Sequence, residues 1–307
     1  MNTEIIAQQM LILFLMMASG YYLSKRGLIS KEGVGGLSSV IINLLNPCLI
    51  IASVINKEIR FNTRMVCENI LLVIGFFTLM IVLSKIFIKL LRVEDDQINT
   101  YRLMTIFPNL GFMGIPLVRS VYGEEAVIFV AFYCIGYNIL MYSYGIMLAA
   151  GGGGKKVRIQ WKRMCNVGFM AGIATVMIFA FHIQAPPLVE AFITPMGNAV
   201  VPLSMMTVGI MVAQSDIKEV FTDKRNLLFT LIDMILVPAV CIPILRLLPI
   251  DPLSYGVFIL MASMPVGSIV IMVEKEYGTT DGSTAARGIA LSSVVSALTI
   301  PLISYLA

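Results

Sequence analysis

The sequence has little charge, a single histidine and a single tryptophan. Only 13% of its 307 residues are charged and 58% are hydrophobic, whereas soluble globular chains contain about 25% charged and about 45–50% apolar residues. This composition excludes a disordered protein, a disulfide-rich secreted module and almost any soluble enzyme. It predicts an all-α polytopic membrane protein, because each membrane-spanning helix needs roughly 20 apolar residues.

The sequence also lacks the groups that would support catalysis, metal binding or nucleic-acid recognition. Its five cysteines contain no CxxC pair, and the only histidine, His182, has no metal-ligating or triad partners at a recognisable spacing. The glycine run 151–154 is not followed by the Lys and Ser or Thr of a phosphate-binding loop. No basic stripe with interleaved aromatic residues is present. We therefore expect no enzyme, no cofactor, no metal site and no nucleic-acid partner.

What the sequence does contain is long apolar runs, separated by charged residues and by Gly or Pro. Read as membrane spans, these runs predict ten transmembrane helices. The fourth and the ninth are broken by prolines and glycines, with Pro108 and Pro265 near their centres. The predicted spans are 5–24, 34–55, 66–91, 100–119, 125–148, 164–183, 188–213, 227–248, 253–274 and 283–306.

The lysines and arginines indicate how these spans are oriented. If the N-terminus lies outside, most of the basic residues fall in cytoplasmic loops and only a few remain outside. This bias supports an even number of spans in the cell membrane, with both termini outside. The first apolar run carries Glu4 and no basic stretch or small-residue cleavage site, so we expect a retained span rather than a signal peptide.

The chain is predicted to consist of two related halves. The motif Asn-x-x-x-Pro occurs at Asn43 and again at Asn198, and at the same offset a Tyr-Gly pair occurs at Tyr122 and at Tyr277. Because each half holds five spans, an odd number, the second half must be inverted relative to the first. The predicted units are a first repeat at 1–150, a glycine-rich and basic cytoplasmic linker at 151–163, and a second repeat at 164–307.

Inverted repeats with paired, proline-interrupted helices are the sequence pattern of a secondary transporter whose substrate site lies near the bilayer midplane. Proline frees backbone groups from the helical hydrogen-bond pattern, and such groups survive at membrane depth only inside protein or beside water. Two half-helix N-termini, each with about half a positive charge, would meet where the breaks cross, at a point suited to a small anion. The predicted substrate-binding residues are Asn109, Pro108, Gly111, Gly114, Pro265, Gly267, Ser268, Tyr137, Asn138, Asn43 and Asn46.

The segment 107–117, followed by Tyr122-Gly123, contains the motif Pro-Asn-x-x-x-x-Gly-Ile-Pro. The segments 264–267 and 274–278 are its second-half counterpart, and 291–301 is the third segment that carries the resemblance. In these segments the sequence resembles the auxin efflux carrier family, as a short, bacterial-type member without the central cytoplasmic domain of many plant PIN-type carriers. The resemblance covers the whole chain and implies a ten-helix fold in which Asn109 binds a substrate carboxylate. It also implies a homodimer, a scaffold made of the first, second, sixth and seventh spans, and a transport domain made of the other six that moves by an elevator or rocking motion.

Two acidic residues within predicted spans are candidates for binding a coupling ion, because an ionisable group inside a membrane is costly. Asp233 lies too deep for so short a side chain to reach water easily. It is either paired with a neighbouring cation or helix terminus, or a proton or sodium site. Glu68 lies near the outer membrane boundary of the third predicted span. The alternative to ion binding there is a carboxylate that is simply solvated by water. By the same resemblance, many members of the family have Lys or Arg at the position that Asp233 occupies here. A basic residue that would pair with the anion is therefore not inferred for this chain.

Three functional hypotheses follow. The first is a secondary transporter of a small organic anion, a mono- or dicarboxylate similar to auxin, malate or malonate, which works by alternating access through the crossover. The second is a cation- or proton-coupled exchanger centred on Asp233, and the third is a membrane sensor that binds a ligand without transporting it. The expected partners are a small carboxylate, the lipid bilayer, a proton or sodium ion and a second copy of the chain.

Overall fold

The computed structural model of the protein describes residues 3–56, 63–151, 167–214, 222–278, 280 and 282–307. Within these ranges the chain is helical, and its extended backbone pairing is limited to a single bridge between Pro108 and Val266. Six stretches of the described chain are helical, long and apolar enough to cross a membrane, which confirms the prediction of an all-α polytopic protein. These six stretches are Gly33–Ala52, Arg64–Leu91, Val127–Ala150, Pro187–Gln214, Lys224–Arg246 and Ser283–Leu306.

Four further apolar helices are shorter, at 10–17 residues. Two of them belong to the fourth and ninth predicted spans, which the structure breaks in the middle. The predicted start of the sixth span at residue 164, like most of the predicted linker 151–163, lies outside the described residues. The total of ten spans and their inverted arrangement therefore remain predictions. The four shorter helices are Leu11–Lys25, Leu110–Tyr122, Val167–Phe181 and Pro252–Ala262.

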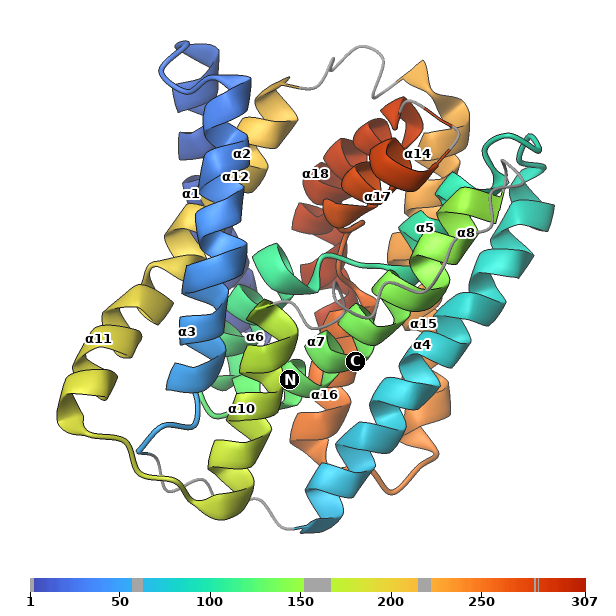
Figure 1. Cartoon of the computed structure of the whole chain (residues 1–307). Helices are drawn as coiled ribbons and strands as arrows, with labels where there is room; N and C mark the ends of the chain where they lie inside the picture. The colour runs from blue at the N-terminus through green and yellow to red at the C-terminus, as the bar shows by residue number, and fades with distance from the viewer. Residues whose placement is uncertain (1–2, 57–62, 152–166, 215–221, 279, 281) are drawn as a thin grey trace.

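The helices of the first half follow the predicted apolar runs. Several are divided into α-helical and π-helical parts, written α and η, of which Figure 1 labels the α-helices. The helical elements are α1 (Thr3–Lys25), α2 (Lys31–Val40), η1 (Ile41–Leu45), α3 (Asn46–Ala52), α4 (Thr63–Leu91), α5 (Ile98–Ile106), η2 (Leu110–Gly114), α6 (Ile115–Tyr122), α7 (Val127–Leu140), η3 (Met141–Gly145) and α8 (Ile146–Ala150).

The helices of the second half are arranged along the chain in a similar way. A break separates α16 from α17, as a break separates α5 from η2 and α6 in the first half. The helical elements are α10 (Val167–Phe181), α11 (Pro187–Asn198), α12 (Val200–Gln214), α14 (Lys224–Leu231), η5 (Ile232–Leu236), α15 (Val237–Arg246), α16 (Pro252–Ala262), α17 (Ile269–Tyr277) and α18 (Ser283–Leu306).

Prolines explain three of the π-helical turns. Pro47, Pro116 and Pro238 lie within the first two positions of α3, α6 and α15, directly after η1, η2 and η5. A proline cannot donate the backbone hydrogen bond that an α-helix requires at its position. The preceding turn therefore widens locally, and such π-helical turns occur often at functional sites.

Figure 1 shows two groups of helices. On the left lie α1, α2, α3, α11 and α12, and on the right lie α4, α5, α8 and α14 to α18, with α10 packed against both α3 and α7. In the left group α1 and α12 approach so closely that a Cβ atom on Gly20 would lie 2.0 Å from the carbonyl oxygen of Met206. On Gly209 it would lie 1.8 Å from that of Met17. Small residues permit this kind of close helix contact in membranes.

Aromatic packing joins the helices of the right group. The ring of Phe76 on α4 makes edge-to-face contacts with Tyr133 on α7 and with Phe258 on α16, at centroid distances of 5.4 and 5.5 Å. All three side chains are buried. Edge-to-face pairs of this kind stabilise packing by about 0.5–1.5 kcal/mol beyond the burial of their surface. This cluster packs helices from both halves of the chain against one another.

Candidate functional site

The two helix breaks meet in the buried interior and pair with each other. The backbone amide of Asn109 donates to the carbonyl oxygen of Pro265 at 2.7 Å, and the amide of Gly267 donates to the carbonyl oxygen of Phe107 at 2.9 Å. These reciprocal bonds form the isolated antiparallel bridge. Backbone groups without a helical partner would be costly in an apolar surrounding, and here each break satisfies groups of the other. We call this junction the crossover.

Gly267 allows the breaks to approach this closely. A Cβ atom at this position would lie 2.7 Å from the carbonyl oxygen of Phe107 and 3.0 Å from both the Pro108 carbonyl oxygen and the Tyr137 hydroxyl. Two of these three neighbours are backbone atoms and cannot move aside cheaply. Any side chain at residue 267 would therefore push the two breaks apart.

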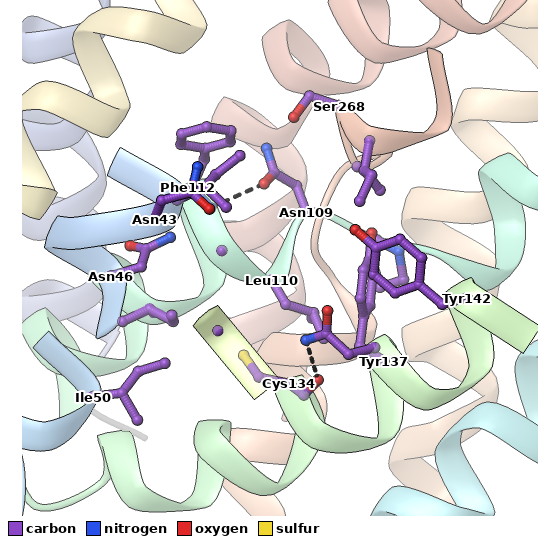
Figure 2. Close-up of a pocket in the computed structure, with 18 residues that line it drawn as sticks. Asn43, Asn46, Ile50, Asn109, Leu110, Phe112, Cys134, Tyr137, Tyr142 and Ser268 are labelled. Carbon is purple, nitrogen blue, oxygen red and sulfur yellow. Dashed lines mark hydrogen bonds between the residues drawn. The ribbon is translucent and has the colours of Figure 1, made fainter. Parts of the chain in front are cut away.

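Asn109 caps the second half of the broken helix. Its side-chain oxygen accepts a hydrogen bond from the backbone amide of Phe112 at 3.1 Å, so the amide NH2 group is turned away from the helix (Figure 2). Within the described chain this NH2 group makes no hydrogen bond. Ser268 occupies the corresponding position at the start of α17. Two helix N-termini thus begin at the crossover, and each contributes a partial positive charge there.

A cavity of about 180 Å³, here called the crossover cavity, lies beside these N-termini. Figure 2 shows Asn109 near its middle, with Asn43 and Asn46 on one side and Tyr137 and Tyr142 on the other. Nine of the eleven predicted substrate-binding residues line it, from both halves of the chain. These nine are Asn43, Asn46, Pro108, Asn109, Gly111, Tyr137, Asn138, Gly267 and Ser268.

The two asparagines of the second predicted span differ in their environment. Asn46 is buried, and its side-chain oxygen has no hydrogen-bond partner in the described part of the chain. Its amide nitrogen lies close to Gly111, where an added Cβ atom would be 3.4 Å away. Asn43 is more exposed and donates to the carbonyl oxygen of Ser39 at 2.9 Å. The NH2 group of Asn43 is therefore bonded within its own helix, whereas Asn46 has a buried oxygen left for a hydrogen-bond donor of a ligand.

Residues of α7 form the opposite wall of the crossover cavity. The ring of Tyr137 packs edge-to-face on Phe107 at 5.4 Å between centroids. Asn138 donates from its side chain to the carbonyl oxygen of Cys134 at 2.8 Å. This wall lines the cavity with aromatic rings and an amide side chain, which suits an organic molecule with both an apolar and a polar part.

The other two predicted substrate-binding residues lie at the crossover without lining the cavity. Gly114 is buried, and a Cβ atom there would lie 3.2 Å from the terminal methyl carbon of Met261. Pro265 contributes its carbonyl oxygen to the bond with Asn109. Both residues therefore contribute to the close packing of the crossover.

A second cavity, of about 290 Å³, lies on another side of the same crossover. It shares Asn109 and Ser268 with the crossover cavity. The predicted orientation places it toward the cytoplasm, because Gln214 and Lys275 lie at the predicted cytoplasmic ends of their helices. Its lining residues are Val34, Asn109, Val208, Met211, Val212, Gln214, Ser268, Ile271, Lys275, Ala286, Ile289, Ala290 and Ser293.

The two candidates for a coupling ion lie away from both cavities. The carboxylate of Glu68 accepts a hydrogen bond from the backbone amide of Asp251 at 2.8 Å and so helps to fix the turn before α16. Asp233 is 8% exposed and lies in the π-helical turn η5. Its carboxylate makes no hydrogen bond or ion pair with any described residue, so the structure gives no support to the paired alternative.

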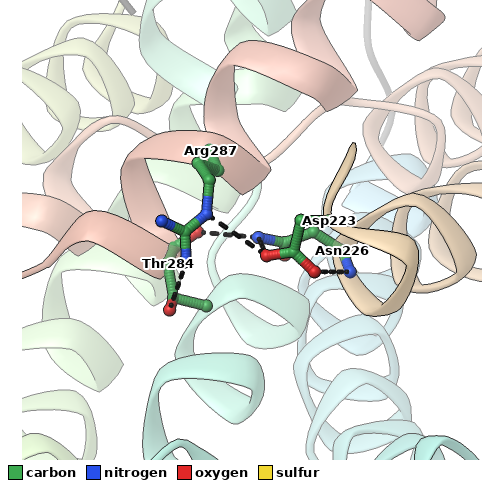
Figure 3. A network of polar contacts seen from close by, with 4 residues as sticks. All are labelled: Asp223, Asn226, Thr284 and Arg287. Carbon is green, nitrogen blue, oxygen red and sulfur yellow. Dashed lines mark hydrogen bonds and ion pairs between the residues drawn. The ribbon is translucent and has the colours of Figure 1, made fainter. Parts of the chain in front are cut away.

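A polar network ties the starts of α14 and α18 together (Figure 3). Asp223 caps α14 by accepting from the backbone amide of Asn226 at 3.1 Å, and its second oxygen accepts from Nε of Arg287 at 3.2 Å. The side-chain amide of Asn226 also donates to the carbonyl oxygen of Thr284 at 3.2 Å. None of these four residues lines the crossover cavity or the second cavity. The network therefore fixes two helices of the right group relative to each other.

Three polar residues near the crossover are not among the predicted substrate-binding residues; for the serines of the last span, bonding to carbonyls of their own helix is the favoured prediction. The hydroxyl of Ser292 accepts from the backbone amide of Val266 at 3.1 Å and anchors the second break to α18. Ser293 and Lys275 line the second cavity. Serines in helices commonly bond their own backbone carbonyls, so the sequence offers no signal that separates Ser292 and Ser293 from Ser296. Lys275 resembles any other basic residue at a cytoplasmic helix end.

Comparisons with known proteins agree with this architecture. The family model described as Membrane transport protein matches the chain over residues 5–163 and 158–304. An "Uncharacterized transporter" of Methanothermobacter thermautotrophicus is 22% identical over 303 residues, which cover 98% of this chain and 97% of the relative. A "Putative malonate transporter" of Rhizobium meliloti is 24% identical over 293 residues, which cover 90% of this chain and 87% of the relative.

These matches extend over nearly the whole chain, and they confirm the resemblance to the auxin efflux carriers that the crossover motifs indicate. The family and the names of the relatives indicate a transporter rather than an enzyme. The apolar helices of the described chain are those of a multi-pass membrane protein. The chain therefore belongs to the Membrane transport protein family, that of the auxin efflux carriers.

Proposed function

We propose that this protein is a secondary transporter of a small organic anion, a mono- or dicarboxylate similar to auxin, malate or malonate. The observation that carries this proposal is the crossover itself. The NH2 group of Asn109 has no partner in the described chain and lies between two helix N-termini, beside the crossover cavity. Hydrogen-bond donors and positive helix ends bind carboxylates well.

The charges around the cavities favour an anion over a cation. No acidic side chain is among the described residues that line the crossover cavity or the second cavity, and Lys275 lines the second. The crossover cavity, at about 180 Å³, is smaller than the roughly 300–1,000 Å³ of pockets for drug-sized ligands. A small substrate fits these properties, and a relative named for malonate transport supports the same class.

Alternating access is the mechanism that this arrangement supports best. The crossover cavity and the second cavity share Asn109 and Ser268, so one binding position would be reached from different sides in different states. We assign the scaffold to α1–α3 and α10–α12, and the transport domain to the other helices, as two inverted repeats joined at 151–163. In this proposal the transport domain moves against the scaffold in the cell membrane, with both termini outside and the scaffolds pairing in a homodimer.

Ligand-dependent thermal stability of the purified protein tests this proposal. A carboxylate that binds should stabilise the fold by about 2.7 kcal/mol at one hundred times its Kd. The panel should include malonate, malate, succinate, propionate, butyrate and indole-3-acetate. Uptake of each stabilising compound into proteoliposomes then separates a transporter from a sensor. No stabilisation by any carboxylate would contradict the proposal.

Two substitutions at Asn109 make this test specific. Asn109→Asp keeps an oxygen that can accept from Phe112 but replaces the NH2 donor with a negative charge, so the fold should persist while stabilisation by carboxylates is lost. Asn109→Ala removes both functions and should also lower the unfolding free energy by about 0.5–2 kcal/mol, as the loss of a helix cap does. If wild type and Asn109→Asp bound carboxylates equally well, Asn109 would not be a substrate-binding residue.

A second candidate function rests on Asp233. It is a buried carboxylate in a π-helical turn, and it has no partner among the described residues. Intramembrane acidic residues of this kind occur in proton and cation pathways. On this hypothesis the protein couples transport to a proton or sodium ion at Asp233, and the anion remains at the crossover.

A further inference from the structure

The second cavity has a cation at one end and unsatisfied polar groups at the other. Lys275 lines it from the last turn of α17, and its ammonium group makes no hydrogen bond or ion pair with the described chain. Ser293 lines it from α18, is 0% exposed, and has a hydroxyl without a hydrogen-bond partner among the described residues. A buried hydroxyl without a partner costs about 1–3 kcal/mol, which a bound ligand would offset.

The spacing along α17 connects these two ends. Ser268, Ile271 and Lys275 are three and seven positions apart, so they lie on one face of the helix, and all three line the second cavity. Seven residues of α-helix span about 10 Å. The stem of Lys275 packs beside Gly282 at the start of α18, where an added Cβ atom would lie 3.4 Å from its Cγ and 3.6 Å from its Cε, and the side chain is exposed at the mouth of the cavity.

Between its two ends the second cavity is mainly apolar. Val34 and Val208 line it from the left group of helices in Figure 1, and Ile289 lines it from α18. A ligand that fits such a cavity has a negative group at each end and a short carbon chain between them. This description matches a dicarboxylate better than a monocarboxylate.

We propose that the second cavity is an anion subsite that extends from the crossover, in which Lys275 pairs with one carboxylate of a dicarboxylate while Ser293 and Asn109 donate to the other. This inference rests on the proposed transport of organic anions and specifies the class of anion. Charge-assisted hydrogen bonds are stronger than neutral ones, so Lys275 contributes most of the preference for a second carboxylate. Lys275 thus determines the preference for dicarboxylates over monocarboxylates. Asn109 lines both cavities.

Paired substrates of equal chain length test the subsite. The half-saturating concentrations of malonate and propionate, and of succinate and butyrate, are measured by thermal shift and by proteoliposome uptake for wild type and Lys275→Gln. We expect Lys275→Gln to weaken both dicarboxylates about tenfold or more and to leave the monocarboxylates unchanged. Lys275→Arg, which keeps the charge, should restore most of the lost affinity.

The matched control is Lys89→Gln. Lys89 is an exposed lysine in the last turn of α4 on the same predicted side, and it lines neither the crossover cavity nor the second cavity. Ser293→Ala provides an independent variant. It should weaken dicarboxylates without lowering the melting temperature, because its hydroxyl has no partner to lose. Ser296→Ala, which removes a bond to the Ser293 carbonyl oxygen at 2.7 Å, controls for a general effect on α18.

The possible outcomes separate the subsite from the proposed function. If wild type binds carboxylates, but Lys275→Gln binds dicarboxylates as well as wild type does, the subsite is wrong and the proposed function stands. Equal weakening of mono- and dicarboxylates would also overturn the subsite, because Lys275 would then act by general charge. If wild type binds no carboxylate, both the subsite and the proposed function are wrong.

Discussion

The side-chain oxygen and the side-chain NH2 group of Asn109 have different roles. Its oxygen caps the helix that begins at the crossover, and its NH2 group remains available to both cavities. An aspartate could perform the first task but would repel a carboxylate, and a lysine could attract a carboxylate but could not cap the helix. Asparagine is therefore well suited to a helix start that also binds an anion.

Asp233→Asn tests whether the buried carboxylate binds a coupling ion. If it does, substitution should abolish the dependence of uptake on an imposed pH or sodium gradient, because the neutral amide cannot exchange a proton or replace a charged ligand. The fold should persist with a melting temperature equal to or above that of wild type, since no observed contact is lost. Uptake into proteoliposomes with imposed gradients measures the first effect.

Asp96→Asn serves as the control for this experiment. Asp96 is an exposed aspartate in the loop before α5, so its neutralisation changes the net charge by the same amount without altering the membrane interior. Unchanged gradient dependence in Asp233→Asn would assign Asp233 no part in coupling.

The partners of individual side chains are what the sequence predicts least well. Asn43 and Asn198 occupy equivalent positions in the repeated motif, yet Asn43 lines the crossover cavity while Asn198 accepts a hydrogen bond from Arg119. The motif predicts the helix that each belongs to but not the partner of its side chain, because that partner comes from a distant segment. For the same reason Lys275 and Ser293 are not among the predicted site residues.

The pairing of the two breaks is the central element of the structure, and Gly267→Ala tests it. The added methyl group would lie 2.7 Å from the Phe107 carbonyl oxygen, so the breaks must separate and their reciprocal hydrogen bonds must lengthen. Overpacking of this kind costs about 1–3 kcal/mol. We expect a lower melting temperature and a loss of carboxylate binding, measured by thermal unfolding with and without ligand.

Gly75→Ala is the matched control for that substitution. Gly75 lies inside α4, and a Cβ atom there would meet nothing within 4 Å. Alanine is the better helix former, by about 0.8–1.0 kcal/mol, so this variant should be as stable as wild type or more stable. If Gly267→Ala behaves like Gly75→Ala, close approach of the breaks is not required.

Elements were predicted well where a local signal exists. Prolines and glycines in otherwise apolar runs identified the broken spans, and the structure places the breaks at Pro108 and Pro265. The π-helical turn η3 has no proline at its end, so no residue type in the sequence indicates where it lies. The hydrogen bonds between the two breaks could not be predicted either, because backbone groups are the same in nearly every residue and leave no pattern in the sequence.

At the scale of the whole molecule, the predicted orientation can be tested with single cysteines. Glu125→Cys and Asp95→Cys each place a thiol at an exposed loop position, in a chain whose own cysteines have been replaced by alanine. The positive-inside pattern predicts that position 125 lies outside and position 95 in the cytoplasm. A membrane-impermeant maleimide added to intact cells should therefore label only the first.

Permeabilised cells provide the control, because both thiols should then react. Labelling of position 95 alone in intact cells would reverse the orientation, and it would place the second cavity outside. The described helices support a polytopic fold, and the predicted inversion of the halves follows from the odd number of spans in each, whichever way the chain is oriented. The distribution of Lys and Arg predicts orientation because it reflects which side of the membrane each loop faces. Contacts within one chain carry no information about the membrane.

The reciprocal bonds at the crossover have a consequence for biosynthesis. Residues 107 and 267 are joined by a backbone hydrogen bond, and a ribosome that adds about 5–20 residues per second needs roughly 8–30 s to travel between them. During this interval the polar backbone of the first break has no partner, and lipid cannot supply one. The fourth span must therefore be sheltered by the insertion machinery, or remain shallow, until the ninth span arrives to complete it.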